Sequence, residues 1–201
     1  MSSGGSSTET ATVPEYGFYV GGRWLAADEK MPVVHKYRGD VLAYVGVADR
    51  VMVERAVDAA AEAFRTQNPS PQERAGWLLR TAALLRERRD DFARLMAQEA
   101  GKPLKEARGE VDRAVQTFIL SAEEGKRIGG ETLPITAQPG SEGRLAFTLR
   151  VPVGIVVAIS PFNFPLNLVA HKVAPALAAG NTVVLKPASS TPLTAIRLVE
   201  T

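Results

Sequence analysis

GIVVAISPFNFPLNLVAHKVAPALAAGNTVVLKP, residues 154–187, is the stretch that decides the fold of this chain. An apolar run from Gly154 to Ile159 is typical of a buried strand, and the alanine-rich segment from about Pro165 to Ala179 is typical of a helix. A second β-branched run, Thr182 to Leu185, follows a Gly-Asn turn. Strand, helix and strand within roughly 30 residues form a βαβ unit, which implies parallel pairing and a right-handed crossover. The sequence therefore predicts an α/β protein, with a further helix that is capped by Thr191 and has Pro192 in its first turn.

Two candidate ligand sites follow from this topology, because ligands of open parallel sheets collect at the carboxyl ends of the strands. One is the loop around Asn163, where a single amide lies between two phenylalanines and two prolines. The other is the turn Lys186–Ser189. The strand-to-helix turn reads S-P-F-N-F-P and lacks the glycine-rich fingerprint of a standard dinucleotide site. We therefore expect a pyrophosphate to bind elsewhere.

The N-terminal part is expected to begin with a disordered tail, because residues 1–14 are small and polar. The run F-Y-V-G-G-R-W predicts one hairpin, and Arg38-Gly39-Asp40 between two apolar runs predicts a second. That R-G-D triplet is interpreted as a plain turn.

Three amphipathic helices are predicted next. The first carries apolar residues from Val53 to Phe64 at helical spacing. The second opens with the capping box Ser70–Glu73 and either continues, or breaks and restarts, before Gly101. The third begins near Pro103. We expect residues 15–127 to be the N-terminal part of a cofactor-binding domain.

The amphipathic helical pattern ends before residues 128–151. G-G-E-T-L-P-I and G-R-L-A-F-T-L-R-V-P-V-G resemble strands, flank a Gly/Ser/Pro linker and have no helix after them. They predict an antiparallel excursion from the main body, after which residues 152–201 begin the Rossmann-type core.

Composition excludes several classes of function. The chain has no cysteine, so it contains no disulfide, thiolate metal site or cysteine nucleophile. Its net charge of +2 is too small to indicate a nucleic-acid partner, and no apolar stretch is long enough to indicate a membrane span. The only histidines, His35 and His171, are too isolated to predict a metal site. A cytoplasmic location is expected.

The run from Val151 to Leu193, together with the V-G-G-R-W, E-R-A-G-W-L-L-R, G-K-P…E-V and G-G-E-T-L-P-I segments, resembles the aldehyde dehydrogenase superfamily. The form P-F-N-F-P-L-N-L-x-x-H-K is most similar to the branch that oxidises small polar aldehydes such as lactaldehyde, glyceraldehyde 3-phosphate or phosphonoacetaldehyde. The resemblance implies a partial Rossmann-type parallel sheet with flanking helices. It also implies that residues 128–151 are oligomerisation strands and that the catalytic domain lies outside this chain.

The same resemblance implies roles for particular residues. Asn163 would donate a hydrogen bond to the oxyanion formed when a thiolate attacks the aldehyde. Lys172 would assist proton transfer near the active site, or is a structural lysine of its helix. The residues implied to bind the cofactor, with Lys186 on the adenosine ribose, are Ile159, Ser160, Pro161, Phe162, Lys186 and Ser189.

Two further expectations concern specificity. Members of the family restricted to NAD commonly have a glutamate where this chain has Ser189, so NADP as well as NAD is expected to be accepted. Arg113 matches a position that can anchor an anionic substrate group, although a solvated helical arginine is the alternative. Phe164, Asn167 and Leu168 match positions that line the aldehyde tunnel.

The cysteine nucleophile, the glutamate base and a glycine-rich turn of this family normally lie beyond the residue that matches Thr201. The chain is therefore expected to be a fragment, inactive alone, of an NAD(P)-dependent aldehyde dehydrogenase that forms a homodimer or homotetramer. Two alternatives stay open. One is a truncated, non-catalytic paralogue that binds nucleotide or a partner, and the other is a semialdehyde dehydrogenase in which CoA replaces water.

Overall fold

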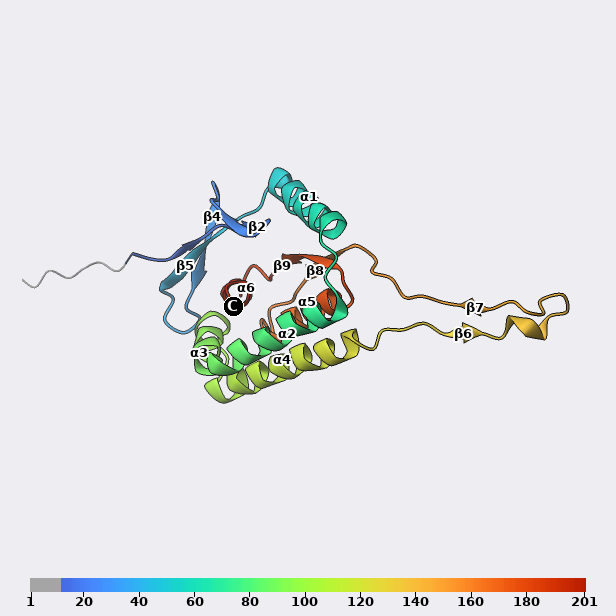
Figure 1. Ribbon diagram of the computed structural model, residues 1–201. Coiled ribbons are helices and arrows are strands. Elements are labelled where there is room, and N and C mark those ends of the chain that lie inside the picture. Colours follow the sequence, from blue (N-terminus) through green and yellow to red (C-terminus); the bar gives the residue numbers. More distant parts are fainter. Residues whose placement is uncertain (1–11) are drawn as a thin grey trace, which may run out of the picture.

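The computed structural model describes residues 12–201 as a mixed α/β body with one long projecting arm (Figure 1). Residues 1–11 of the predicted disordered tail lie outside the described residues. Residues 12–14 have no regular secondary structure. No helix in the described part of the chain is both long and apolar enough to cross a membrane.

The predicted βαβ unit is confirmed. Strands β8 (Ile155–Ile159) and β9 (Thr182–Lys186) pair in parallel, and α5 (Asn167–Ala178) connects them. The helix begins at Asn167 rather than near Pro165, because the loop stays non-helical through Pro165. Ile159 lies opposite Lys186, so the carboxyl ends of both strands meet at one edge.

The predicted cap of the last helix, α6 (Leu193–Val199), is wrong. Thr191 makes no capping bond to it; its hydroxyl instead donates to the carbonyl of Phe162 at 3.5 Å. The first amides of α6 donate to the carboxylate of Glu99, which comes from a helix far away in the sequence. A tertiary contact therefore replaces the local cap.

Both predicted N-terminal hairpins are present. The turn between β2 (Phe18–Val20) and β3 (Arg23–Leu25) holds Gly21 and Gly22 at φ of 59° and 81°, a left-handed conformation that favours glycine. The second hairpin joins β4 (Lys30–Val34) to β5 (Val41–Gly46). A short strand, β1 (Glu15–Tyr16), adds parallel to β5, which gives the order β1-β5-β4.

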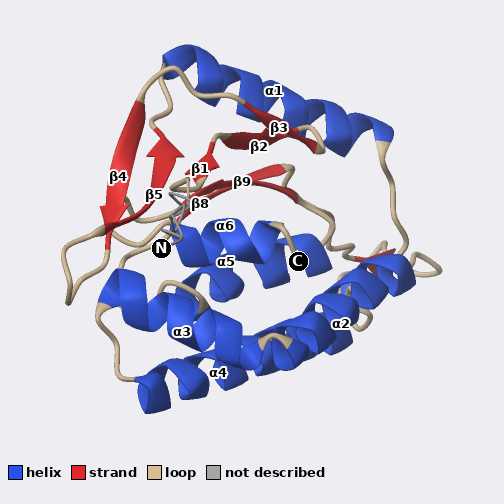
Figure 2. Ribbon diagram, turned by 90° about the vertical axis from the view of Figure 1, so that its left-hand side faces the viewer, coloured by secondary structure: helices blue, strands red, loops and turns tan. Residues whose placement is uncertain are grey.

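The helical layer settles whether the second predicted helix continues to Gly101 or breaks before it. The second predicted helix ends and restarts at Arg88, so the four helices are α1 (Arg50–Thr66), α2 (Pro71–Glu87), α3 (Arg89–Ala100) and α4 (Leu104–Gly125). Figure 2 shows α4 beside α2 and α3, with α5 and α6 between these helices and the strands. The core where they meet is apolar and fully buried, and includes Leu78, Leu85, Phe92, Met96, Val111, Phe118, Leu166 and Val169.

The capping box of α2 predicts a measurable loss of stability. The Ser70 side chain accepts from the amide of Glu73 at 3.3 Å, and the Glu73 carboxylate accepts from the amide of Ser70 at 2.8 Å. Ser70→Ala removes the first bond and should lower the free energy of unfolding by about 1 kcal/mol. Urea unfolding followed by circular dichroism measures this, with Ser141→Ala in the exposed arm as the control. An unchanged urea midpoint for Ser70→Ala would contradict it.

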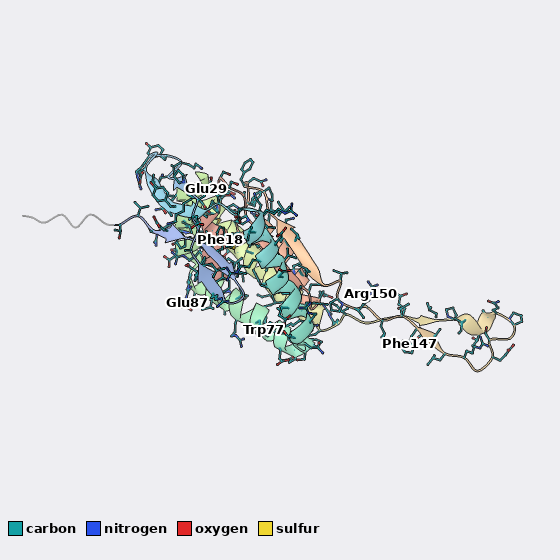
Figure 3. The ribbon with its side chains drawn as sticks, turned by 90° about the horizontal axis from the view of Figure 1, so that it is seen from above. Phe18, Glu29, Trp77, Glu87, Phe147 and Arg150 are labelled. Atoms are coloured by element: carbon teal, nitrogen blue, oxygen red, sulfur yellow. The ribbon has the colours of Figure 1, made fainter. Side chains whose placement is uncertain are left out.

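The antiparallel excursion is present as an arm that projects from the body (Figures 1 and 3). Only β6 (Thr132–Leu133) and β7 (Ala146–Phe147) pair within it, and a short 3-10 helix, Ile135–Ala137, follows β6. Figure 3 shows Phe147 out along this arm, away from the body, and Arg150 nearer the base of the arm. Several of its apolar side chains are largely exposed, namely Leu145, Phe147, Leu149, Val151 and Val153.

Candidate functional site

The carboxyl edge of the β8–β9 sheet brings the two predicted loops together. The amide of Ser160, just past β8, donates to the carbonyl of Lys186 at 3.2 Å. Ser160 itself is buried, whereas the other residues predicted to bind a cofactor expose their side chains at this edge: Ile159, Pro161, Phe162, Lys186 and Ser189.

This edge is chemically suited to a nicotinamide dinucleotide. Ile159 and Phe162 are 62% and 64% exposed, so this edge has an apolar surface on which a planar ring can lie. The Lys186 ammonium and the Ser189 hydroxyl can donate hydrogen bonds to ribose or phosphate oxygens. The residues present therefore fit such a group, and their roles in holding it remain a prediction.

Asn163 lies on the wall of a hollow of about 690 Å³, a volume in the range of small-molecule sites. Among residues 12–201, no hydrogen bond involves the Asn163 side chain, and the residue is exposed. Its carboxamide can therefore donate to a molecule in the hollow. Other lining side chains come from four loops and include Lys36, Lys102, Phe162, Phe164, Ser190 and Thr191.

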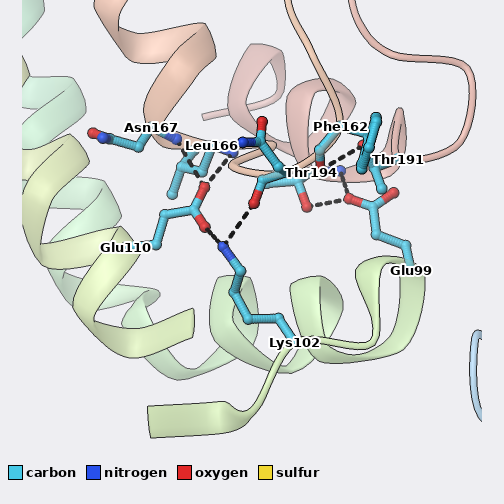
Figure 4. Close-up of polar contacts among 9 residues, drawn as sticks. Glu99, Lys102, Glu110, Phe162, Leu166, Asn167, Thr191 and Thr194 are labelled. Carbon is cyan, nitrogen blue, oxygen red and sulfur yellow. Dashed lines mark hydrogen bonds and ion pairs between the residues drawn. The ribbon is translucent and has the colours of Figure 1, made fainter. Parts of the chain in front are cut away.

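A buried carboxylate holds the start of α5 beneath this loop (Figure 4). Glu110, on α4, has no exposed surface, and its Oε1 accepts from the amides of Leu166 and Asn167 at 2.9 and 3.0 Å. Its Oε2 is paired with Lys102, whose Nζ donates to the carbonyl of Asn163 at 3.0 Å. The amides at a helix N-terminus lack partners within the helix and carry partial positive charge, so a carboxylate is well suited to them.

Glu99 caps the start of α6 in the same way. Its Oε2 accepts from the amide of Leu193 at 2.8 Å, and its Oε1 accepts from the amide of Thr194 at 2.9 Å and from the Thr194 hydroxyl (Figure 4). Burial raises the pKa of Glu99, while these three hydrogen bonds and the charge of Lys36 act in the opposite direction. Both helices that follow the strands are thus capped by carboxylates from the helical layer.

A second hollow, of about 510 Å³, contains two of the predicted substrate residues, Arg113 and Asn167, together with His171. The acidic group on its wall, Asp112, forms a bidentate pair with Arg89 at 2.7 and 2.6 Å. That pair holds the pKa of Asp112 below its usual range.

Arg113 and Asn167 both retain unused hydrogen-bonding capacity in this hollow. Arg113 forms no ion pair within the described part of the chain; its guanidinium carbon lies 5.2 Å from the centre of the Phe164 ring. The Oδ1 of Asn167 is buried and has no hydrogen-bond partner among residues 12–201. The wall of this hollow therefore carries a cation that is unpaired among the described residues, and Asn167, whose Oδ1 is buried, lines the same hollow.

The remaining predicted residues lie apart from both hollows. Lys172 and Leu168 are half-buried on α5 and line neither of them, so their roles stay predictions. His35 has a local role, because its Nδ1 accepts from the amides of Tyr37 and Arg38 at 3.2 and 3.3 Å in the β4–β5 turn.

Sequence reasoning missed Glu99, Lys102 and Glu110, although a signal was present. Both glutamates lie in register with apolar residues of their helices, Glu99 with Met96 and Glu110 with Ala107 and Ala114. A charged residue on a buried helix face is rare unless it is paired, so this register could have indicated the two buried carboxylates.

Comparison with known proteins supports the fold. A sequence model of the "Aldehyde dehydrogenase family" matches residues 24–201. The 3-sulfolactaldehyde dehydrogenase of Priestia aryabhattai is 50% identical over 193 residues, which are 96% of this chain and 40% of that protein.

Solved structures agree. Aldehyde dehydrogenase 21 from Physcomitrella patens, in complex with the reaction product succinate, superposes with a TM-score of 0.89 at 41% identity, over 94% of this chain and 40% of that one. The NADP complex of glyceraldehyde-3-phosphate dehydrogenase from Methanocaldococcus jannaschii superposes with a TM-score of 0.80 at 39% identity, over 86% of this chain and 37% of that one. The chain thus spans about 40% of the length of these relatives. The predicted α/β fold and the resemblance to the branch acting on small polar aldehydes are confirmed.

Proposed function

The chain belongs to the aldehyde dehydrogenase family, and on that premise we propose that it is the N-terminal part of an NAD(P)-dependent enzyme that oxidises a small polar aldehyde to its carboxylic acid. The observation that carries this proposal is the Asn163 carboxamide, exposed and free on the wall of a hollow at the carboxyl end of β8. A neutral donor stabilises developing negative charge there without competing as a base.

In the proposed reaction, a cysteine thiolate from outside residues 1–201 adds to the aldehyde carbon, and the carbonyl oxygen becomes an oxyanion. The Nδ2–H of Asn163 donates to that oxygen. When bound, NAD(P) accepts the hydride that leaves the same carbon. A glutamate from outside this chain then activates the water that releases the acid. Phe162 and Phe164 flank Asn163 and would limit the access of water to the oxyanion.

The cofactor would lie along the exposed edge from Ile159 to Phe162, with Lys186 donating to the adenosine ribose. The NADP complex of the glyceraldehyde-3-phosphate dehydrogenase from Methanocaldococcus jannaschii supports NADP as a ligand of this fold. The choice between NAD and NADP is proposed to depend on Ser189, which is exposed beside Lys186 and is uncharged.

Ser189→Glu should turn the enzyme toward NAD. A carboxylate at this position would accept from the ribose 2′-hydroxyl of NAD and repel the 2′-phosphate of NADP. We expect kcat/KM with NADP to fall about tenfold or more, with little loss for NAD. Ser189→Gln, of similar length but uncharged, is the matched control. An equal effect of Glu and Gln on NADP would show that size rather than charge matters, and unaltered NADP kinetics would contradict the assignment of Ser189.

The substrate is proposed to carry an anionic group and a hydroxyl. In the second hollow, Arg113 has no ion-pair partner within residues 12–201, and Asn167 would accept from a hydroxyl after its buried Oδ1 turns into the hollow. The names of the relatives are in keeping with this, since 3-sulfolactaldehyde has both groups. Phe164, Leu168 and Lys172 keep the roles predicted for them at the aldehyde tunnel and in proton transfer.

The arm formed by residues 128–151 is proposed to pair with another subunit in a cytoplasmic homodimer or homotetramer. Its exposed apolar side chains, with Leu145 at 76% and Val151 at 74%, would be covered in that assembly.

The test uses the complete protein encoded by the gene. It is supplied with NADP or NAD and with lactaldehyde, glyceraldehyde 3-phosphate or 3-sulfolactaldehyde, and both reduced cofactor and product are measured with and without CoA. We expect the free acid, one per reduced cofactor, without a requirement for CoA. An acyl-CoA product would indicate the CoA-acylating alternative. Binding of NADPH without turnover of any aldehyde would indicate a non-catalytic nucleotide-binding protein.

A further inference from the structure

We propose that Lys102, held in place by Glu110, is a positioning residue that sets the direction of the Asn163 carboxamide. This inference rests on the proposed function, in which Asn163 is the oxyanion donor. It concerns Glu110 of α4 and Lys102 of the loop before it, two residues to which the proposed reaction assigns no role.

The contacts of Lys102 are unusual for a lysine at the end of a loop. Its side chain is only 13% exposed, and its Nζ has three partners: the Glu110 carboxylate, the carbonyl of Asn163 at 3.0 Å and the Phe164 ring, whose centre is 4.0 Å away. Two of these three belong to the oxyanion loop. A lysine whose only function was to neutralise Glu110 would not need them.

Glu110 completes the arrangement from the other side. Its Oε1 accepts from the amides of Leu166 and Asn167, and its Oε2 holds Lys102. The ion pair therefore fixes the loop at the carbonyl of Asn163 and again at the first amides of α5. Figure 4 shows these hydrogen bonds converging on one carboxylate and one ammonium group.

This arrangement determines where the Asn163 side chain points. The Asn163 carboxamide has no hydrogen bond of its own within residues 12–201, so its direction depends on the backbone that carries it. An oxyanion donor acts only if it is held in place before the negative charge develops. Without Lys102, the peptide after Asn163 loses its only side-chain donor among the described residues, and the amide can turn away from the oxyanion.

The experiment compares variants of the complete protein. The main variant is Lys102→Met/Glu110→Gln, which removes both charges together and leaves no unpaired carboxylate, while the Gln oxygen can still accept from Leu166 and Asn167. We expect kcat/KM for the aldehyde to fall about 10- to 100-fold, the effect expected when a catalytic group is displaced by a fraction of an ångström to an ångström. NADP affinity, measured by fluorescence titration, should stay within about twofold, because the cofactor residues are untouched.

A double-mutant cycle separates positioning from general damage. In an Asn163→Ala background, the same pair of substitutions should change kcat/KM by less than about threefold, because the donor that Lys102 orients is already gone. Lys105→Met, which removes an exposed lysine in the first turn of α4, is the matched control and should behave as wild type. The single variant Lys102→Arg can still donate to the Asn163 carbonyl and should retain most of the wild-type kcat/KM.

Two kinetic results would overturn the inference. One is wild-type kcat/KM in Lys102→Met/Glu110→Gln, and the other is an equal loss in the wild-type and Asn163→Ala backgrounds. Hydrogen exchange gives a readout that needs no turnover, since the amides of residues 163–168, other than Pro165, should exchange faster in the double variant. Faster exchange in a protein that oxidises no aldehyde would show that the Lys102–Glu110 pair holds the Asn163 loop, but would contradict the proposed function. Unchanged exchange would show that the pair does not hold the loop, and would contradict the inference itself.

Discussion

Asn163→Ala is expected to lower kcat/KM for the aldehyde by about 10²–10³-fold in the complete enzyme, the loss typical of removing one oxyanion donor. The side chain is exposed and makes no hydrogen bond to residues 12–201, so its removal should leave folding unchanged. The loss should fall on the chemical step, seen as slower formation of reduced cofactor in a single turnover, with the affinity for NADP preserved.

The control for this prediction is Asn68→Ala, which removes an exposed amide from the loop between α1 and α2. Asn163→Asp is a second comparison, because a carboxylate has the same shape but would repel the oxyanion and should be at least as damaging as alanine. Near-wild-type activity of Asn163→Ala would remove the oxyanion role and with it the main support for the proposed function.

Glu99→Ala is expected to be the most destabilising single change discussed, at about 3 kcal/mol of unfolding free energy. It leaves the buried amides of Leu193 and Thr194 and the Thr194 hydroxyl without an acceptor at the start of α6. Urea unfolding measures the loss, and Glu123→Ala, at an exposed position of α4, is the control and should change stability little. A loss no larger than that of the control would show that water replaces the carboxylate.

The same residue gives the stability a pH dependence of known sign. Burial raises the pKa of Glu99 above its ordinary value of 4.5. Between that value and the raised pKa, the folded protein holds a proton that the unfolded chain releases. The contribution of this group to stability is therefore complete below pH 4.5 and is lost as the pH rises through the raised pKa. The difference in unfolding free energy between wild type and Glu99→Gln should accordingly fall as the pH is raised from about 4. A difference that rises with pH would mean that the hydrogen bonds outweigh burial.

Much of the fold could be predicted because its determinants are local in sequence. The Gly21-Gly22 turn, the Ser70–Glu73 capping box and the apolar strand ahead of the S-P-F-N-F-P turn each identify an element from a few neighbouring residues. The Asn163 loop could be placed at the sheet edge for the same reason, because a loop after a parallel strand lies at its carboxyl end.

The features that sequence reasoning missed depend on contacts between distant residues. The Thr191 cap was predicted from local spacing, but the start of α6 is capped instead by the carboxylate of Glu99, which lies 95 residues from Thr194 in the sequence. Lys102 reaches the Asn163 carbonyl across 61 residues, and nothing near Lys102 in sequence predicts that partner. Local rules therefore placed the Asn163 loop at the sheet edge, whereas the side chains that contact this loop became visible only when the helices were packed on the sheet.

The most direct test of the oxyanion role of Asn163 is a structure of the complete protein with an aldehyde, or a stable aldehyde analogue, bound covalently at its cysteine. We predict that Nδ2 of Asn163 lies within about 3 Å of the oxygen derived from the carbonyl, as an oxyanion donor requires. We also predict that Lys102 still donates to the carbonyl of Asn163. If that oxygen lies near other donors and Asn163 points away from it, the assignment of this loop as the oxyanion site is wrong.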